Sequence, residues 1–108
     1  MSSSGAYLRF FMLENRQHRG ILLYEWLLEQ AKKMGIHGGS AFRAIAGFGR
    51  HGVIHEQHFF ELAGDLTVRV DFVVSDADAD RLLELVNSEK QSIFYARLAT
   101  EFGVTGEE

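Results

Sequence analysis

Neither cysteine nor proline occurs among the 108 residues of the sequence. Without cysteine the chain forms no disulfide and offers no thiolate, so a disulfide scaffold, a cysteine nucleophile and a cysteine-ligated zinc site are excluded. Without proline, its turns have to be located from glycine and short polar residues. A basic excess is missing too, because 15 acidic residues outnumber 11 basic ones. That balance argues against nonspecific binding to nucleic acid or to an anionic membrane.

Long apolar runs are also absent. No stretch approaches the roughly 20 residues that a membrane span needs, and the opening MSSSGAYLRFF does not have the pattern of a signal peptide. We therefore expect no direct membrane insertion and a cytoplasmic location. Apolar residues still make up 46% of the chain, enough for the core of one small domain. A domain of this size gains from assembly into an oligomer.

Hydrophobic periodicity predicts strands and helices in alternation. We expect strands at residues 6–13, 40–49, 66–74 and 92–102, a further strand at 55–63, and helices at 21–34 and from residue 76 onward. Ser75 is the expected N-cap of the second helix, with Asp78 three residues on. This order predicts an α+β, ferredoxin-like (βαββαβ) subunit with two helices on one face of an antiparallel sheet. The domain would span residues 6–102, between a disordered N-terminus (1–5) and a flexible tail (103–108).

The segment from Gly47 to Gly52 reads Gly-Phe-Gly-Arg-His-Gly and fits the pattern G-x-G-x-x-G. A dinucleotide-binding turn needs a helix directly after these glycines, so that the helix N-terminus meets the pyrophosphate. The residues that follow, VIHEQHFFEL, carry no helical face. The glycines therefore indicate an unusual backbone at a strand end, where backbone amides can also hold an anion.

Several motifs resemble those of the PII signalling proteins, and more closely those of a PII-like family of unknown function. They are Gly-x-x-Gly at 35–38, R-x-I-x-G-F-G at 43–49, Ile-His at 54–55, and Asp-Leu at 65–66 before a valine-rich strand. The resemblance covers roughly residues 6–102. It implies a homotrimer that binds a small effector, such as an adenine nucleotide, in clefts between subunits. The chain would be a regulator and not an enzyme, signalling through a flexible loop (residues 50–65) to a membrane transporter or an enzyme.

The resemblance also implies which residues line the effector site. The Gly-Phe-Gly strand end would form the cleft wall and the hinge of the loop. PII proteins hold phosphates with a glycine- and lysine-containing loop and paired arginines, where this chain has NSEKQS and the single Arg97. Phosphate binding is therefore either weak or provided by other basic residues. The candidate ligand-binding residues are Ser40, Arg43, Gly47, Phe48, Gly49, Arg50, His51, His55 and Lys90.

Other functions rest on weaker patterns. His51, His55 and His58 would bind a metal only if their segment is a loop that lets them converge, and a CutA-like trimeric metal-binding or structural protein is the alternative to a PII-like regulator. The acidic run SDADAD lacks the glycine and glutamate of a calcium loop, which favours helix capping. No nucleophile elbow or acid–base pair indicates an enzyme, and no firm cofactor is implied. His18 and His37 are expected in loops.

Overall fold

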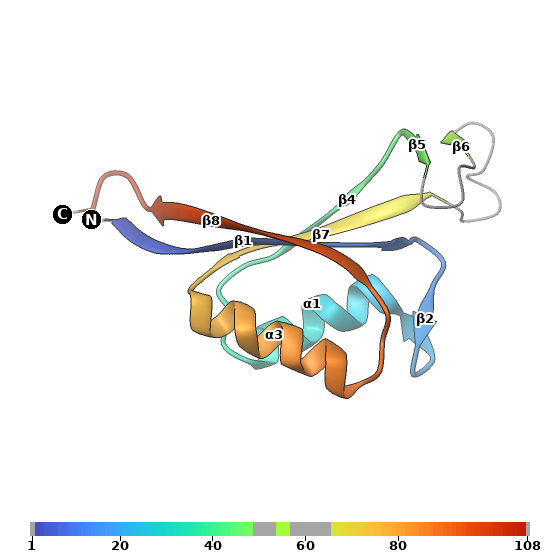
Figure 1. The fold of residues 1–108 in the computed structure, drawn as a ribbon, viewed down its shortest axis with the longest axis horizontal. Helices are drawn as coiled ribbons and strands as arrows, with labels where there is room; N and C mark the ends of the chain where they lie inside the picture. The colour runs from blue at the N-terminus through green and yellow to red at the C-terminus, as the bar shows by residue number, and fades with distance from the viewer. Residues whose placement is uncertain (1, 49–53, 57–65, 108) are drawn as a thin grey trace.

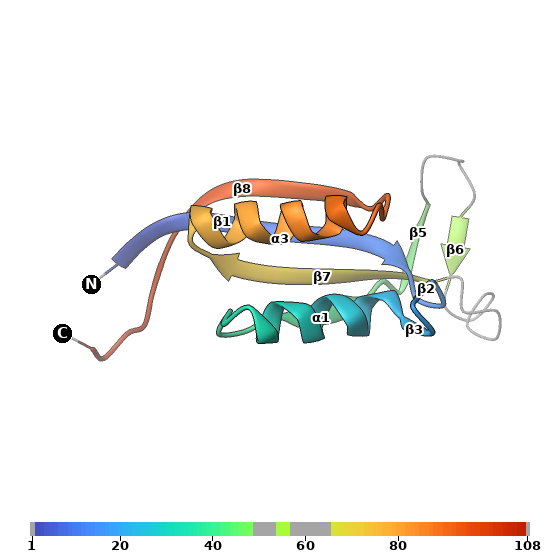
Figure 2. The same cartoon turned by 90° about the horizontal axis from the view of Figure 1, so that it is seen from below.

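A computed structural model describes residues 2–48, 54–56 and 66–107. Four strands form an antiparallel sheet in the order β4-β7-β1-β8, namely β4 (Ser40–Arg43), β7 (Thr67–Val74), β1 (Ser2–Leu13) and β8 (Phe94–Gly103). Helices α1 (Leu23–Lys33) and α3 (Asp76–Ser88) lie on the same face of this sheet (Figures 1 and 2). The predicted ferredoxin-like α+β fold is therefore confirmed.

The core lies between the sheet and the two helices. Alternation along β1 and β7 points one set of side chains at the helices, and these are almost fully buried: Ala6, Leu8, Phe10, Met12, Val68, Val70, Phe72 and Val74. The helices contribute Leu23, Trp26, Leu27 and Ala31 from α1 and Ala79, Leu82 and Val86 from α3. The strands predicted at residues 6–13 and 66–74 are thus present, each with one buried face, as a period of two along a strand requires.

Two helix ends follow local rules. The backbone N–H of Asp78 donates to Ser75 Oγ at 3.1 Å, so the predicted N-cap of α3 is confirmed. At the C-terminal end of α1, Gly35 has a φ of +88° and stops the helix, in agreement with the predicted helix at 21–34. Helix α1 begins at Leu23 rather than at residue 21, because Ile21–Leu22 (β3) pairs with Gln17–His18 (β2). His18 therefore lies in a strand and not in a loop.

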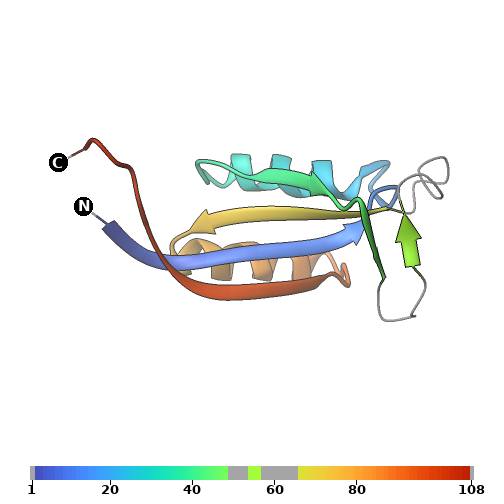
Figure 3. The same cartoon turned by 90° about the horizontal axis from the view of Figure 1, so that it is seen from above.

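Strand limits differ from the prediction where pairing extends them. β1 begins at Ser2, because residues 2–5 pair with Thr100–Gly103 of β8. Residues 2–5 are thus a strand and not the predicted disordered N-terminus, and β8 runs one residue further than expected. The shared β1–β8 ribbon extends past the end of β7, whose last paired residue is Val74 (Figure 3).

The predicted strand 40–49 is divided into two. The backbone N–H of Ala44 donates to Thr67 O at 2.9 Å, and β7 begins at that threonine, so β4 has no partner strand beyond this point. The chain then forms β5 (Ala46–Phe48), which pairs with β6 (Ile54–Glu56). This hairpin stands at one end of the sheet, away from the helices (Figure 1). Within the predicted strand 55–63, residues 57–63 lie outside the described residues.

Neither of the two helices described here has the length and apolar content needed to cross a membrane.

Candidate functional site

One face of the sheet, called here the open face, carries no described helix (Figure 3). The strand register places on it Tyr7, Arg9, Phe11, Leu13, Ser40, Phe42, Thr67, Arg69, Asp71, Val73, Phe94, Ala96, Leu98 and Thr100. Five large apolar side chains of this face are exposed, namely Leu13, Phe42, Val73, Phe94 and Leu98. Contiguous apolar exposure of this kind is typical of a surface that contacts another protein or a ligand.

A network of charged side chains lies at the centre of the open face. Asp71 is only 7% exposed. The Tyr7 hydroxyl donates to Asp71 Oδ2 at 2.9 Å, and Arg69 Nε donates to Asp71 Oδ1 at 2.8 Å. The guanidinium of Arg69 also lies over the Phe42 ring, 4.9 Å from its centroid. The carboxylate is therefore held in one orientation by a hydroxyl and a cation.

A pocket of about 330 Å³ opens beside this network. Tyr7, Ser40, Phe42, Asp71 and Val73 line it, together with the glycines at 38 and 39. Ser40 lies opposite Asp71 in the register of β4 and β7. The structure thus places Ser40, a predicted site residue, in a pocket whose walls are partly aromatic and partly polar. That composition is typical of a small-molecule site.

Gly39 allows the chain to pass close to the core at this edge. A Cβ atom built on Gly39 would lie 2.5 Å from Cε1 of Phe72. On the helix side of the same segment lies a second pocket of about 290 Å³, which includes Lys32 and His37. The Gly38–Gly39 backbone therefore separates a pocket on the open face from one beside α1.

The other predicted residues of this region are divided between faces. Arg43 lies opposite Val68, on the helix side of β4, and forms an ion pair with Glu14. Gly47 and Phe48 lie in β5, where Phe48 is 73% exposed. The backbone of His55 pairs with that of Gly47 in the β5–β6 hairpin. Gly49, Arg50 and His51 lie outside the described residues, and their predicted roles stay predictions.

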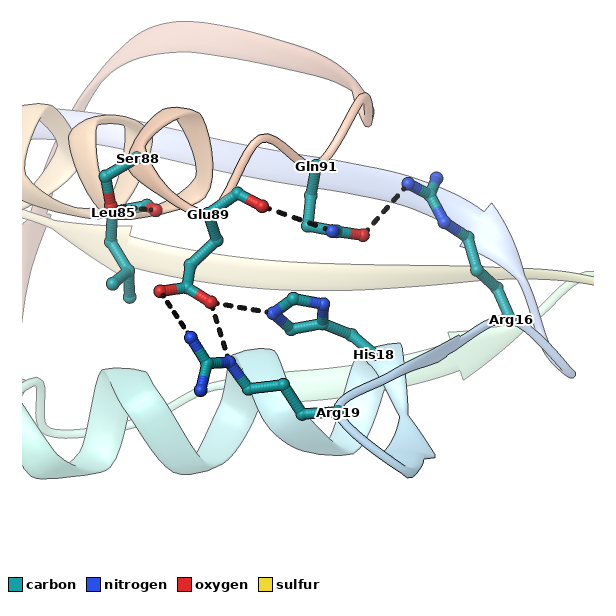
Figure 4. A network of polar contacts seen from close by, with 7 residues as sticks. All are labelled: Arg16, His18, Arg19, Leu85, Ser88, Glu89 and Gln91. Carbon is teal, nitrogen blue, oxygen red and sulfur yellow. Dashed lines mark hydrogen bonds and ion pairs between the residues drawn. The ribbon is translucent and has the colours of Figure 1, made fainter.

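Lys90 lies apart from the other candidate ligand-binding residues. It follows Glu89, the C-cap of α3, with a φ of +57°, and so belongs to the end of a helix rather than to a strand of the open face. Its neighbour Glu89 accepts hydrogen bonds from Arg19 Nε at 2.9 Å and from His18 Nε2 at 2.8 Å (Figure 4). The hydrogen bond with His18, and then that with Arg19, lowers the pKa of Glu89 below its ordinary value. A basic and acidic cluster thus joins the β2–β3 hairpin to the end of α3.

Additional contacts strengthen the same junction. Arg16 Nη2 donates to Gln91 Oε1 at 3.2 Å (Figure 4). In addition, Arg16 Nη1 donates to the Ser92 carbonyl at 2.7 Å. The ring of His18 packs edge-on against Trp26, with centroids 4.7 Å apart. Sequence reasoning missed this cluster, because its members are about seventy residues apart and no local spacing connects them.

Arg97, the one arginine at the position of the paired PII arginines, is held by α3. Its guanidinium contacts Asp80 Oδ1 at 2.7 Å and Asp76 Oδ1 at 3.0 Å. The hydrogen bond with Asp80, and then that with Asp76, raises the pKa of Arg97. Arg97 therefore holds the start of α3 against β8. Any phosphate binding would have to come from other residues.

The described side chains contain no group of three or more metal-ligating residues that could hold a metal ion. Of the predicted histidine cluster, His51 and His58 lie outside the described residues, and only the backbone of His55 is placed. The metal hypothesis stays a prediction about that segment.

The family follows from comparison with known proteins. The family model DUF190, described as "Uncharacterized ACR, COG1993", matches residues 5–96. The chain belongs to the DUF190 family. A UPF0166 protein of Aquifex aeolicus (strain VF5) is 34% identical to it over 86 residues, which cover 80% of this chain and 82% of that protein.

Solved structures share the fold of this DUF190 protein. CPII, a nitrogen regulatory PII-like protein from Thiomonas intermedia K12 bound to ADP, AMP and bicarbonate, has a TM-score of 0.70 at 17% identity, with 96% of this chain and 92% of that chain covered. A putative PII-like signaling protein from Thermus thermophilus has a TM-score of 0.62 at 16% identity, with 94% and 90% covered. The predicted resemblance to a PII-like family is therefore confirmed.

Proposed function

We propose that this DUF190 protein is a PII-like regulator. It assembles as a homotrimer through its open face and binds a small effector, an adenine nucleotide, in clefts between subunits. It signals through residues 50–65 to a membrane transporter or an enzyme. The observation that carries this proposal is the exposed apolar face beside a pocket, in the fold of a protein that binds ADP, AMP and bicarbonate. We also propose that the protein catalyses no reaction and that it is located in the cytoplasm.

The open face supports assembly with further copies of the same chain. Its exposed aromatic and aliphatic side chains surround a centre where Asp71 is already paired within the face. Around a common axis, apolar faces of this kind can bury area against one another without requiring a partner of opposite charge. A chain this small also gains stability from such burial.

The β4 edge supports effector binding. The pocket of about 330 Å³ next to Ser40 is large enough to hold a nucleobase. It opens on the face that the assembly covers, so a neighbouring subunit would close it. Phe48 on β5 does not line this pocket, but it is 73% exposed and offers a second place where a base can stack on a ring. Since Arg43 is paired with Glu14, phosphate binding at Arg43 would compete with that carboxylate, and Arg50 and His51 are the other proposed contacts.

The test is a titration of the purified protein with ATP, ADP and AMP, with and without bicarbonate, by calorimetry, together with its mass by sedimentation. We expect a trimeric mass and saturable binding of at least one nucleotide. Phe48→Ala should weaken that binding about tenfold, the loss expected for one base–aromatic stack. Val104→Ala is the matched control, because Val104 is also exposed but lies after β8 and far from β5.

The alternatives give different results. Absence of binding to every nucleotide would remove the effector from the proposal. Metal retained through dialysis, and lost in His55→Ala or His58→Ala, would favour the CutA-like alternative. Equal nucleotide affinities in Phe48→Ala and Val104→Ala would place the base elsewhere.

A further inference from the structure

The charges on the open face do not balance. Alternation in the described strands places three charged side chains on it: Arg9 from β1, and Arg69 and Asp71 from β7. The remaining described positions of this face are apolar, aromatic or hydroxyl-bearing. One positive charge per chain is therefore left at the centre of a mostly apolar surface.

Arg9 carries the surplus charge. Both oxygens of Asp71 already accept a shorter contact, from Tyr7 and Arg69. Arg9 Nε forms only a long ion pair with Asp71 Oδ2, at 4.0 Å, which is too far for a hydrogen bond. This Nε atom is buried and has no hydrogen-bond partner among the described residues. The guanidinium lies over the Tyr7 ring, 4.6 Å from its centroid, and its side chain is 35% exposed.

Assembly through the open face makes this arrangement costly. A guanidinium that loses its water needs an acceptor, because a buried and unpaired charge is strongly unfavourable. Identical copies bring no further carboxylate on this face, since Asp71 is the one acidic side chain that the described strands place there and it already binds Tyr7 and Arg69 of its own chain. They bring another Arg9 instead, so like charges would be enclosed together.

We infer that the assembled protein encloses a small oxyanion, of the phosphate, sulfate or carboxylate class, held at the open face by Arg9. The planar fork of a guanidinium matches two oxygens of such an ion and forms charge-assisted hydrogen bonds with them. This inference rests on the proposed assembly. Arg9 does not itself line the effector pocket, but it borders that pocket, because it lies over the ring of Tyr7 and beside Asp71, which both line it. The anion would stabilise the oligomer rather than carry the signal.

The test measures assembly of the full chain against inorganic phosphate at constant ionic strength, by sedimentation equilibrium in a chloride buffer. Addition of phosphate should lower the apparent subunit dissociation constant of the wild type about tenfold, because a ligand of the assembled state favours that state by mass action. Arg9→Met, which keeps an unbranched apolar stem and removes the charged guanidinium, should assemble without phosphate and respond by less than about twofold. Arg81→Met is the control and should respond as the wild type does, because Arg81 lies on α3 and pairs with Asp78.

Each outcome decides a separate point. An oligomer whose dissociation constant does not respond to phosphate, or an Arg9→Met variant that responds as the wild type does, would overturn the anion site and leave the proposed assembly intact. A monomeric wild type at all concentrations would overturn both. If circular dichroism shows that Arg9→Met is unfolded, Arg9→Lys takes its place. Lysine keeps the charge but loses the fork, so its phosphate response should fall several-fold, and an unchanged response would contradict the inference.

Discussion

Gly39 is the residue at which the chain passes between the two pockets of the β4 edge. A Cβ atom there would lie 2.5 Å from Cε1 and 2.8 Å from Cδ1 of Phe72, whose side chain is fully buried and has little room to move. We predict that Gly39→Ala lowers the free energy of unfolding by about 1–3 kcal/mol through overpacking. Urea denaturation measures this loss.

Gly38→Ala is the matched control for that prediction. No atom lies within 4 Å of a Cβ built on Gly38, so its free energy of unfolding should stay within about 0.5 kcal/mol of the wild-type value. Equal stability of the two variants would show that Phe72 moves aside at low cost.

Glu89 gives a pH-dependent prediction at the same scale. Its pKa is lowered below the ordinary 4.5 by hydrogen bonds from His18 and Arg19. A carboxylate whose pKa is lower in the folded than in the unfolded chain stabilises the fold above that ordinary value, and the contribution disappears as pH falls through the folded pKa. We predict that Glu89→Gln is less stable than the wild type at neutral pH and that the difference vanishes under acidic conditions.

Thermal unfolding of both proteins across a pH series measures this difference. Glu84→Gln serves as the reference, because Glu84 lies on the same helix and makes no hydrogen bond or ion pair with the described residues. A constant gap between Glu89→Gln and wild type at all pH values would assign the effect of Glu89 to packing instead of charge.

At the scale of elements, α3 depends on its N-terminal cap. Ser75 Oγ accepts the hydrogen bond of the Asp78 backbone N–H, which would otherwise have no partner inside the helix. We predict that Ser75→Ala lowers the free energy of unfolding by about 1 kcal/mol, measured by urea denaturation. Ser88→Ala should have a much smaller effect, because its hydroxyl donates to the Leu85 carbonyl within the last turn. A neutral Ser75→Ala would mean that water replaces the cap.

Elements with local signals were predictable from the sequence, and elements set by distant partners were not. The cap at Ser75, the helix end at Gly35 and the alternation of residues 66–74 depend on neighbours in the chain. The start of β1 at Ser2 depends on pairing with Gly103, and the break after β4 depends on where β7 begins. No single-sequence pattern encodes such pairings.

The same distinction explains what was found of the candidate site. The segment from Ser40 to Phe48 was singled out because it contains most of the motif R-x-I-x-G-F-G. Alternation within the predicted strand implies that Ser40 and Arg43 face opposite sides of β4, but the sequence did not reveal that Glu14 pairs with Arg43. The polar centre around Asp71 could have been found, because alternation places Arg9 and Arg69 on the face opposite the core. Lys90 was assigned by resemblance, and its place at the end of α3 rather than in a strand of the open face depends on the tertiary fold.

At the scale of the whole molecule, the proposed assembly depends on the open face. Leu98 is 51% exposed and lies opposite Tyr7 in the register of β1 and β8. We predict that Leu98→Lys weakens assembly by about 2 kcal/mol or more, as for a central interface residue, and that sedimentation then gives a smaller mass. Val104→Lys adds the same charge at a residue that is 64% exposed outside the sheet, and should keep the wild-type mass. Identical masses for the two variants would place the interface on another surface.

The ribbon of β1 and β8 also determines how the molecule would respond to mechanical force. Ser2 lies opposite Gly103, so the two chain ends leave the antiparallel pair side by side (Figure 1). Inter-strand hydrogen bonds in such a pair run perpendicular to the strands. Tension applied between the two ends would therefore load these bonds one after another, starting at the tip. An isolated subunit held by its ends should unzip at low force, whereas a subunit pulled along β1 from opposite ends of the sheet would resist by shear.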